Sequence, residues 1–173
     1  MTARPGSRLH WKARMYESIR ALSEELGTLL VKGHSTLAVA ESCTGGLLGA
    51  AITESAGASR YFAGGVISYD NSIKNKLLNI PVATLEKHGA VSAETVAAMA
   101  AGVCELFHSD AAIAVSGIAG PSGGTEDKPV GLVLIGIAFH GIIRTFEYRF
   151  EGTRSEIREQ SVEQGLRRLI EQL

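Results

Sequence analysis

The feature that most constrains the fold is a pair of short, continuously apolar segments set among helical patterns. Residues 36–40 read TLAVA, and residues 111–117 read AAIAVSG. Runs of this length are typical of strands buried on both faces of a sheet, which occur mainly in parallel sheets covered by helices. Because helical patterns separate the strands along the chain, the sequence predicts a three-layer α/β/α sandwich.

The other expected elements complete one domain with a mixed sheet. Apolar residues recur every three or four positions from Tyr16, and Thr153 with Glu156 forms a capping-box pattern before the last apolar stripe, so helices are expected at both ends. A tight turn at residues 140–141 joins two strand patterns, which must run antiparallel. The prediction is a mixed, mostly parallel sheet of about five strands, in the order α-β-α-β-α-α-β-β-β-α.

Composition limits the class of protein. The chain has 173 residues, a net charge of -1, 45% apolar residues and 20% charged residues, which is typical of one globular domain. No apolar run has the length of a membrane span, no signal-peptide core is visible, and the two cysteines make no disulfide framework. We expect a cytoplasmic protein without membrane association, and the charge balance does not favour nucleic acid.

The first fifteen residues are the one basic stretch. They hold four cations with no acid before Glu17, namely Arg4, Arg8, Lys12 and Arg14. Since chain ends tolerate excess charge, we interpret residues 1–15 as a solvated extension and residues 16–173 as a single domain. The alternative is an arm that binds nucleic acid or an anionic surface.

Polar or glycine-rich segments follow the three expected parallel strands. Ligands of open α/β sheets bind beyond the carboxyl ends of the strands, so these segments should meet at one edge. They are residues 41–46, 69–74 and 117–129.

The first of these segments reads ESCTGG. It should place Ser42 at the start of a helix, with free N–H groups from Thr44, Gly45 and Gly46. Such a helix start can bind a phosphate or the oxyanion of an acyl-transfer reaction. For this segment alone, a capped helix whose glycines allow tight packing is the favoured interpretation.

The second segment contains a lysine with unusual surroundings. Lys74 follows a helix cap at Asn71 or Ser72, so it should lie in a first helical turn. The helix dipole and partial burial should lower its pKa, which would let it take a proton from a serine. Tyr69 could relay that proton. For this lysine alone, a solvated Lys74 beside Lys76 is the favoured interpretation.

The third segment, SGIAGPSGGTEDKPVG, is rich in small residues. Its backbone N–H groups could hold a phosphate or ribose, with side chains from Ser116, Ser122, Thr125 and Lys128. The Walker A and dinucleotide-binding patterns are absent, and none of the five histidines has the spacing of a metal pair. We therefore expect no metal site and no cofactor.

Five blocks closely resemble the carboxy-terminal domain family of the competence/damage-inducible protein CinA. They are AESCTGG, SYDNSIKNKLL, HGAVSAETV, SGIAGPSGGTEDKPVG and FEGTRSEIREQ. The resemblance covers roughly Ile19 to the C-terminus. Stand-alone members are nicotinamide-nucleotide amidases, so the resemblance implies an α/β/α sandwich and the hydrolysis of nicotinamide mononucleotide to nicotinate mononucleotide and ammonia, a step of pyridine nucleotide salvage.

The resemblance also implies roles for single residues. Ser42 falls on the nucleophile, Lys74 on its base and Tyr69 on the associated tyrosine, while Asp70 departs from the small or hydroxyl residue expected there. The expected partner is a small-molecule nucleotide, and we expect a homo-oligomer. The residues expected to bind substrate are Glu41, Thr44, Gly45, Gly46, Asn71, Ser116, Gly117, Gly120, Gly123, Gly124 and Arg154.

Two other functions stay open. One is a non-catalytic nucleotide-binding or interaction domain linked to competence or the DNA-damage response; only the enzyme requires contact between Ser42 and Lys74. The other is a cysteine amidase that uses Cys43, whose thiol would be activated at a helix N-terminus. Inward packing as a small apolar side chain is the favoured interpretation of Cys43.

Overall fold

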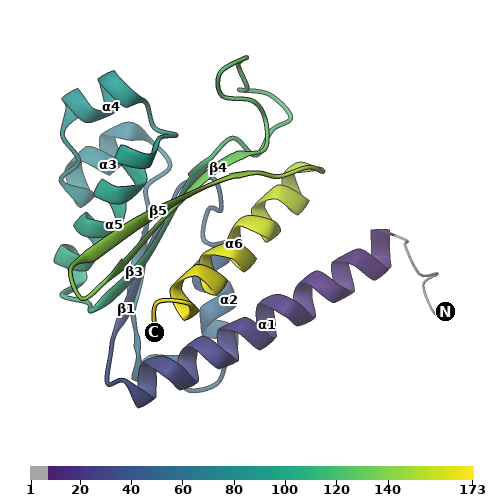
Figure 1. Cartoon of the computed structure of the whole chain (residues 1–173), viewed down its shortest axis with the longest axis vertical. Helices are drawn as coiled ribbons and strands as arrows, with labels where there is room; N and C mark the ends of the chain where they lie inside the picture. The colour runs from purple at the N-terminus through teal and green to yellow at the C-terminus, as the bar shows by residue number, and fades with distance from the viewer. Residues whose placement is uncertain (1–7) are drawn as a thin grey trace.

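The computed structural model describes residues 8–173, which form a five-stranded sheet between two layers of helices (Figure 1). One face of the sheet is covered by α1 (Arg8–Lys32), α2 (Leu47–Glu54) and α6 (Arg154–Ile170). The other face is covered by α3 (Asn71–Leu78), α4 (Val82–His88) and α5 (Ala93–Phe107). The predicted three-layer sandwich is confirmed.

The sheet has the strand order β2-β1-β3-β4-β5. Its strands are β1 (Leu37–Glu41), β2 (Phe62–Ile67), β3 (Ala111–Gly117), β4 (Leu132–Phe139) and β5 (Ile142–Arg149). Strand β1 pairs in parallel with β2 and β3, whereas β4 pairs antiparallel with both β3 and β5. Within the described sheet, β4 alone therefore runs against the other strands, and the mixed, mostly parallel sheet is confirmed.

The two faces of the sheet carry side chains of different size. Successive residues of a strand point to opposite faces, so Val39 packs toward α1, α2 and α6 while Ala38 and Ala40 pack toward α5. In β4, a Cβ added to Gly136 would lie 2.4 Å from the carbonyl oxygen of Val96 in α5. Small residues thus let α5 approach the sheet closely.

Helix α1 differs from the prediction at its start. It begins at Arg8 rather than at Tyr16, because the earlier segment contains good helix formers that need no apolar stripe. The amino-terminal part of α1 extends past the sheet (Figure 1). Residues 1–7, including Arg4, lie outside the described residues, so the boundary between an extension and a domain at residue 16 stays a prediction. None of the described helices combines the length and the apolar character needed to cross a membrane.

Smaller differences concern the edges of strands. A short 3-10 helix, Ala58–Arg60, precedes β2 and was not expected, since three residues carry too little periodicity to reveal it. Strand β1 includes Glu41, one residue beyond the predicted end. The tight turn between β4 and β5 lies at residues 140–141 as predicted.

Candidate active site

A cleft of about 240 Å³ lies beyond the carboxyl ends of β1, β2 and β3, where the sequence places the ligand. It brings together eight of the predicted site residues: Ser42, Tyr69, Lys74, Ser116, Gly117, Gly120, Gly123 and Arg154. It does not include six others: Glu41, Thr44, Gly45, Gly46, Asn71 and Gly124. Its remaining lining residues are Cys43, Ala90, Val91, Ile118, Ala119 and Ser122.

Lys74 is the central polar contact of the cleft. Its Nζ donates to Ser42 Oγ at 3.3 Å and to the carbonyl oxygens of Ser68 at 2.7 Å and Tyr69 at 3.2 Å. The lysine is fully buried, and no ion pair joins it to a carboxylate of residues 8–173. Burial lowers the pKa of Lys74, while the charge of Asp70 acts in the opposite direction. Lys74 is therefore easier to deprotonate than a solvated lysine, and it lies beside a hydroxyl.

The start of α3 explains how Lys74 is placed. The helix is capped by Asp70, whose carboxylate accepts from the backbone N–H of Ser72 at 2.8 Å. The predicted cap at Asn71 or Ser72 is therefore wrong by one or two residues, because Asp70 is itself a strong capping residue. The hydroxyl of Ser72 also donates to this carboxylate, and the hydroxyl and the backbone N–H together lower the pKa of Asp70. Lys74 thus lies in the first turn of the helix.

The turn after β1 differs from the prediction. Helix α2 begins at Leu47, so Ser42 does not start it, and the helix amides already have an acceptor. The carboxylate of Glu41 accepts from the N–H groups of Gly46 at 2.9 Å, Leu48 at 3.1 Å and Gly49 at 2.8 Å. Glu41 is 2% exposed and serves the helix, and the Gly46 amide is not free for a ligand.

Two other amides follow Ser42 directly in the chain. The N–H groups of Cys43 and Thr44 donate to no other residue among residues 11–173, whereas Gly45 N–H donates to Ser42 O at 3.2 Å. The carbonyl of Cys43 accepts from Arg158 Nε at 3.1 Å, and a second guanidinium N–H donates to Thr44 O at 2.6 Å. In a trans peptide the C=O and N–H point in opposite directions. The contact of Arg158 with Cys43 O therefore fixes the direction of the Thr44 N–H, and the contact of Gly45 N–H with Ser42 O fixes that of the Cys43 N–H.

Arg154 joins α6 to the glycine-rich loop and to the mouth of the cleft. Its guanidinium donates to Gly120 O at 2.8 Å and to the hydroxyl of Tyr69 at 3.2 Å. Lys74 and Arg154 are the only lysine or arginine in the cleft lining, and no carboxylate of the described residues lines it. The guanidinium of Arg154 stays protonated, so it gives the cleft a positive charge suited to an anionic group.

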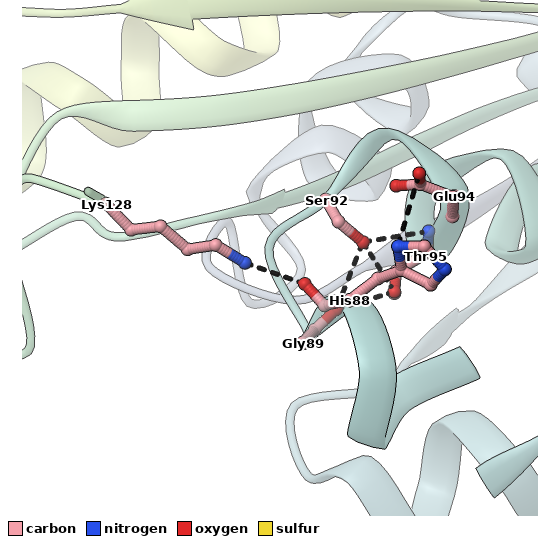
Figure 2. Close-up of polar contacts among 6 residues, drawn as sticks. All are labelled: His88, Gly89, Ser92, Glu94, Thr95 and Lys128. Carbon is pink, nitrogen blue, oxygen red and sulfur yellow. Dashed lines mark hydrogen bonds and ion pairs between the residues drawn. The ribbon is translucent and has the colours of Figure 1, made fainter. Parts of the chain in front are cut away.

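The turn at residues 88–92 forms one wall of the cleft through Ala90 and Val91. Ser116 Oγ donates to Ala90 O at 2.7 Å, so this hydroxyl is already bonded. Lys128 Nζ donates to His88 O at 2.7 Å, as Figure 2 shows. The ammonium of Lys128, which we expected to face a ligand, is therefore directed at the protein itself.

Cys43 is poorly suited to act as a nucleophile. Its side chain is 5% exposed, and burial raises the pKa of the thiol to about 11. A thiolate would therefore be scarce at neutral pH. The expected activation at a helix N-terminus is also missing, because α2 starts at Leu47 and its first amides contact Glu41.

Comparison with known proteins agrees with this architecture. Residues 19–173 match the CinA C-terminal domain family. The solved structure of a competence/damage inducible protein from Agrobacterium tumefaciens is 36% identical, with a TM-score of 0.87 over 99% of this chain and 98% of that chain. A competence damage-inducible protein from Klebsiella pneumoniae is 35% identical, with a TM-score of 0.86 over 88% of this chain and 95% of that chain.

Curated relatives extend beyond the matched region. A putative competence-damage inducible protein of Halothermothrix orenii is 49% identical over 143 residues, which are 82% of this chain and 35% of the relative. A CinA-like protein of Endomicrobium trichonymphae is 49% identical over 84% of this chain and 34% of its own length. The chain thus spans about a third of the length of these relatives.

Proposed function

This chain belongs to the CinA C-terminal domain family, and from that premise we propose that it is an amidohydrolase of nicotinamide mononucleotide. The products are nicotinate mononucleotide and ammonia. The observation that carries the proposal is the 3.3 Å contact between Lys74 Nζ and Ser42 Oγ, made by a fully buried lysine without a carboxylate partner. A surface lysine with a structural role would need none of these features.

The first chemical step is the formation of an acyl-enzyme. Neutral Lys74 takes the proton of Ser42, and Oγ attacks the amide carbon, so the carbonyl oxygen becomes an oxyanion. The free N–H groups of Cys43 and Thr44 are the donors available to that oxyanion. Collapse breaks the C–N bond, and the Lys74 ammonium returns the proton to the leaving nitrogen, which departs as ammonia.

The second step releases the acid. Water gives a proton to the again neutral Lys74 and attacks the ester carbon, and Ser42 leaves with that proton restored. The two carbonyls that hold Nζ, those of Ser68 and Tyr69, keep it beside Ser42 throughout both steps. No group beyond water and the substrate is consumed.

We assign substrate binding to the side of the cleft formed by Arg154 and the glycine-rich loop. Arg154 supplies a positive charge, and the glycines at positions 117, 120 and 123 leave backbone accessible along the wall. A nucleotide phosphate matches this combination of guanidinium and backbone amides. Binding energy from phosphate and ribose would position the amide at Ser42. The expected homo-oligomer and cytoplasmic location remain predictions.

The experiment is a measurement of ammonia release from nicotinamide mononucleotide by the purified protein. Ser42→Ala should retain its fold and lose at least about 300-fold in turnover, since oxyanion donors and binding still contribute some catalysis. Free nicotinamide should be a poor substrate. Tight binding of the mononucleotide by the wild-type protein without ammonia release would instead support a non-catalytic nucleotide-binding domain.

A further inference from the structure

Three consecutive carbonyls in the turn after α4 each accept a side-chain donor from a different part of the fold. Figure 2 shows the contacts at His88 and Gly89. The donors are Lys128 to His88 O at 2.7 Å, Thr95 to Gly89 O at 2.7 Å and Ser116 to Ala90 O at 2.7 Å. The turn is thereby tied to the glycine-rich loop, to α5 and to the end of β3 at once.

The loop at residues 117–129 is stiff at its base and at its tip. At the base, Ile118 N–H donates to Leu132 O at 2.8 Å. At the tip, Thr125 N–H donates to Lys128 O at 2.8 Å, and Lys128 N–H donates to Thr125 Oγ1 at 3.1 Å. Within the described residues, two side-chain hydrogen bonds tie the loop to other elements: Arg154 donates to Gly120 O between base and tip, and Lys128 donates to His88 O from the tip.

We propose that Lys128 is a positioning residue that fixes the separation of two walls of the cleft. One wall is the turn at residues 88–92, and the other is the loop at residues 117–129. Ser42 and Lys74 belong to other elements, so Lys128 acts on the affinity for substrate and leaves the bond-making step unchanged. This proposal about Lys128 depends on the proposed function only for the choice of nicotinamide mononucleotide as the ligand.

The local chemistry suits a lysine at this position. His88 is the last residue of α4, and carbonyls at a helix C-terminus attract a cation. Gly89 has φ +78, and a Cβ added there would lie 3.0 Å from Lys128 Nζ, so the glycine clears the path of the ammonium. On the other side of the turn, His88 Nδ1 lies 3.2 Å from Glu94 Oε1, which orients the imidazole away from this path (Figure 2).

A solvated surface lysine is the competing explanation, and the chain offers a matched control for it. Lys87 precedes His88 on the same helix, is exposed and carries the same charge. Lys128→Met removes the ammonium and keeps most of the aliphatic stem, and Lys87→Met removes an equal charge without a contact to the loop. Lys128→Arg keeps a cationic donor, so this variant should behave much like the wild-type protein.

Hydrogen exchange provides a test that needs no turnover. Lys128→Met should raise the exchange rates of loop amides, including Thr125, by about ten-fold, whereas Lys87→Met should leave them within about two-fold. Circular dichroism and thermal unfolding establish that each variant is folded. If the loop amides of Lys128→Met exchange at the wild-type rate, the proposal is overturned.

Binding and kinetics then separate positioning from chemistry. On a Ser42→Ala background, calorimetry with nicotinamide mononucleotide should show a Kd about ten-fold weaker for Lys128→Met and near-unchanged for Lys87→Met. In the active enzyme the KM should rise by a similar factor, with kcat within about two-fold. An effect confined to kcat overturns the proposal. A wild-type protein that releases no ammonia removes the proposed reaction, while the exchange data still decide the role of Lys128.

Discussion

Two ionisable side chains are buried beside the candidate active site, and their surroundings are opposite. Glu41 ends β1 and accepts three N–H groups at the start of α2, where a carboxylate meets the positive end of a helix. Lys74 lies in the first turn of α3, where a cation meets the same positive end. Its partners are two carbonyls and one hydroxyl, and the nearby Asp70 is bonded to Ser72.

The comparison shows how to tell a buried ionisable residue that stabilises the fold from one that takes part in the reaction. The side chain of Glu41 accepts from three backbone N–H groups at the start of α2, so this residue contributes to the fold. Burial lowers the pKa of Lys74 and makes it easier to deprotonate, and a deprotonated amine is a base. Burial is common to both residues, and the match between a charge and its partners distinguishes them.

Of the two buried residues, Lys74 is the one proposed to react, and its replacement should have the largest effect on activity. Lys74→Met should lower kcat/KM for nicotinamide mononucleotide by at least about 1000-fold, because Ser42 then has no base. The control is Lys76→Met on the exposed side of the same helix. A Lys74→Met enzyme within ten-fold of wild type would show that the buried lysine is not the base.

The next effect concerns stability rather than activity. Glu41→Gln replaces an acceptor-only group by one whose amide donor faces helix N–H groups, so the free energy of unfolding should fall by about 2–3 kcal/mol in denaturant titrations. Glu25→Gln, at an exposed position of α1, should change it by less than about 0.5 kcal/mol. If Glu41→Gln kept the wild-type stability and lost as much activity as Lys74→Met, the distinction between the two residues would be wrong.

A third effect concerns the amides next to Ser42. Arg158→Gln frees the carbonyls of Cys43 and Thr44, so the Thr44 N–H, which shares a peptide plane with the Cys43 carbonyl, loses its fixed direction. We expect kcat to fall about ten-fold at nearly constant KM, since the lost interaction belongs to the transition state. Arg167→Gln, which removes an exposed pair with Glu163, is the matched control. A change in KM alone would assign Arg158 to substrate binding.

The smallest effect is a pH dependence of stability. The pKa of Lys74 is lowered in the folded protein, so the unfolded chain binds more protons between that pKa and the ordinary lysine value of about 10.4. Wild-type stability relative to Lys74→Met should therefore rise with pH across this window, by at most about 1.4 kcal/mol per pH unit. Urea titrations at several pH values measure it. A constant difference would mean that burial does not shift the titration of Lys74.

Activity should follow the same titration. Because the neutral amine is the reactive form, kcat/KM should rise with pH and level off below the pH at which an ordinary lysine loses its proton. Rate measurements across that range check it. An enzyme most active at acid pH would contradict a lysine base.

Much of the fold could be predicted because local signals and tertiary packing agree. The apolar runs of β1 and β3 are buried on both faces, as their composition indicates, and Thr153 forms the predicted capping box of α6. The candidate site could be located because parallel strands end at one edge. Its two central residues, Ser42 and Lys74, each follow the carboxyl end of a strand.

The rest of the site depends on contacts that no local pattern encodes. The sequence shows that amides follow Ser42, but Glu41 takes those of the helix and leaves those of Cys43 and Thr44. Arg158 was missed because its contacts depend on how α6 packs against a distant turn. Its position within the block FEGTRSEIREQ was the only available signal.

The contact of Arg158 with the turn after Ser42 also has a consequence for biosynthesis. Ribosomes build a chain from its amino end, and 115 residues separate Cys43 from the arginine that holds its carbonyl. The serine and the lysine are therefore translated long before the amides beside them can be fixed. The site therefore reaches its full activity only after α6 has been made and has docked, so the order of translation delays the full activity of a growing chain.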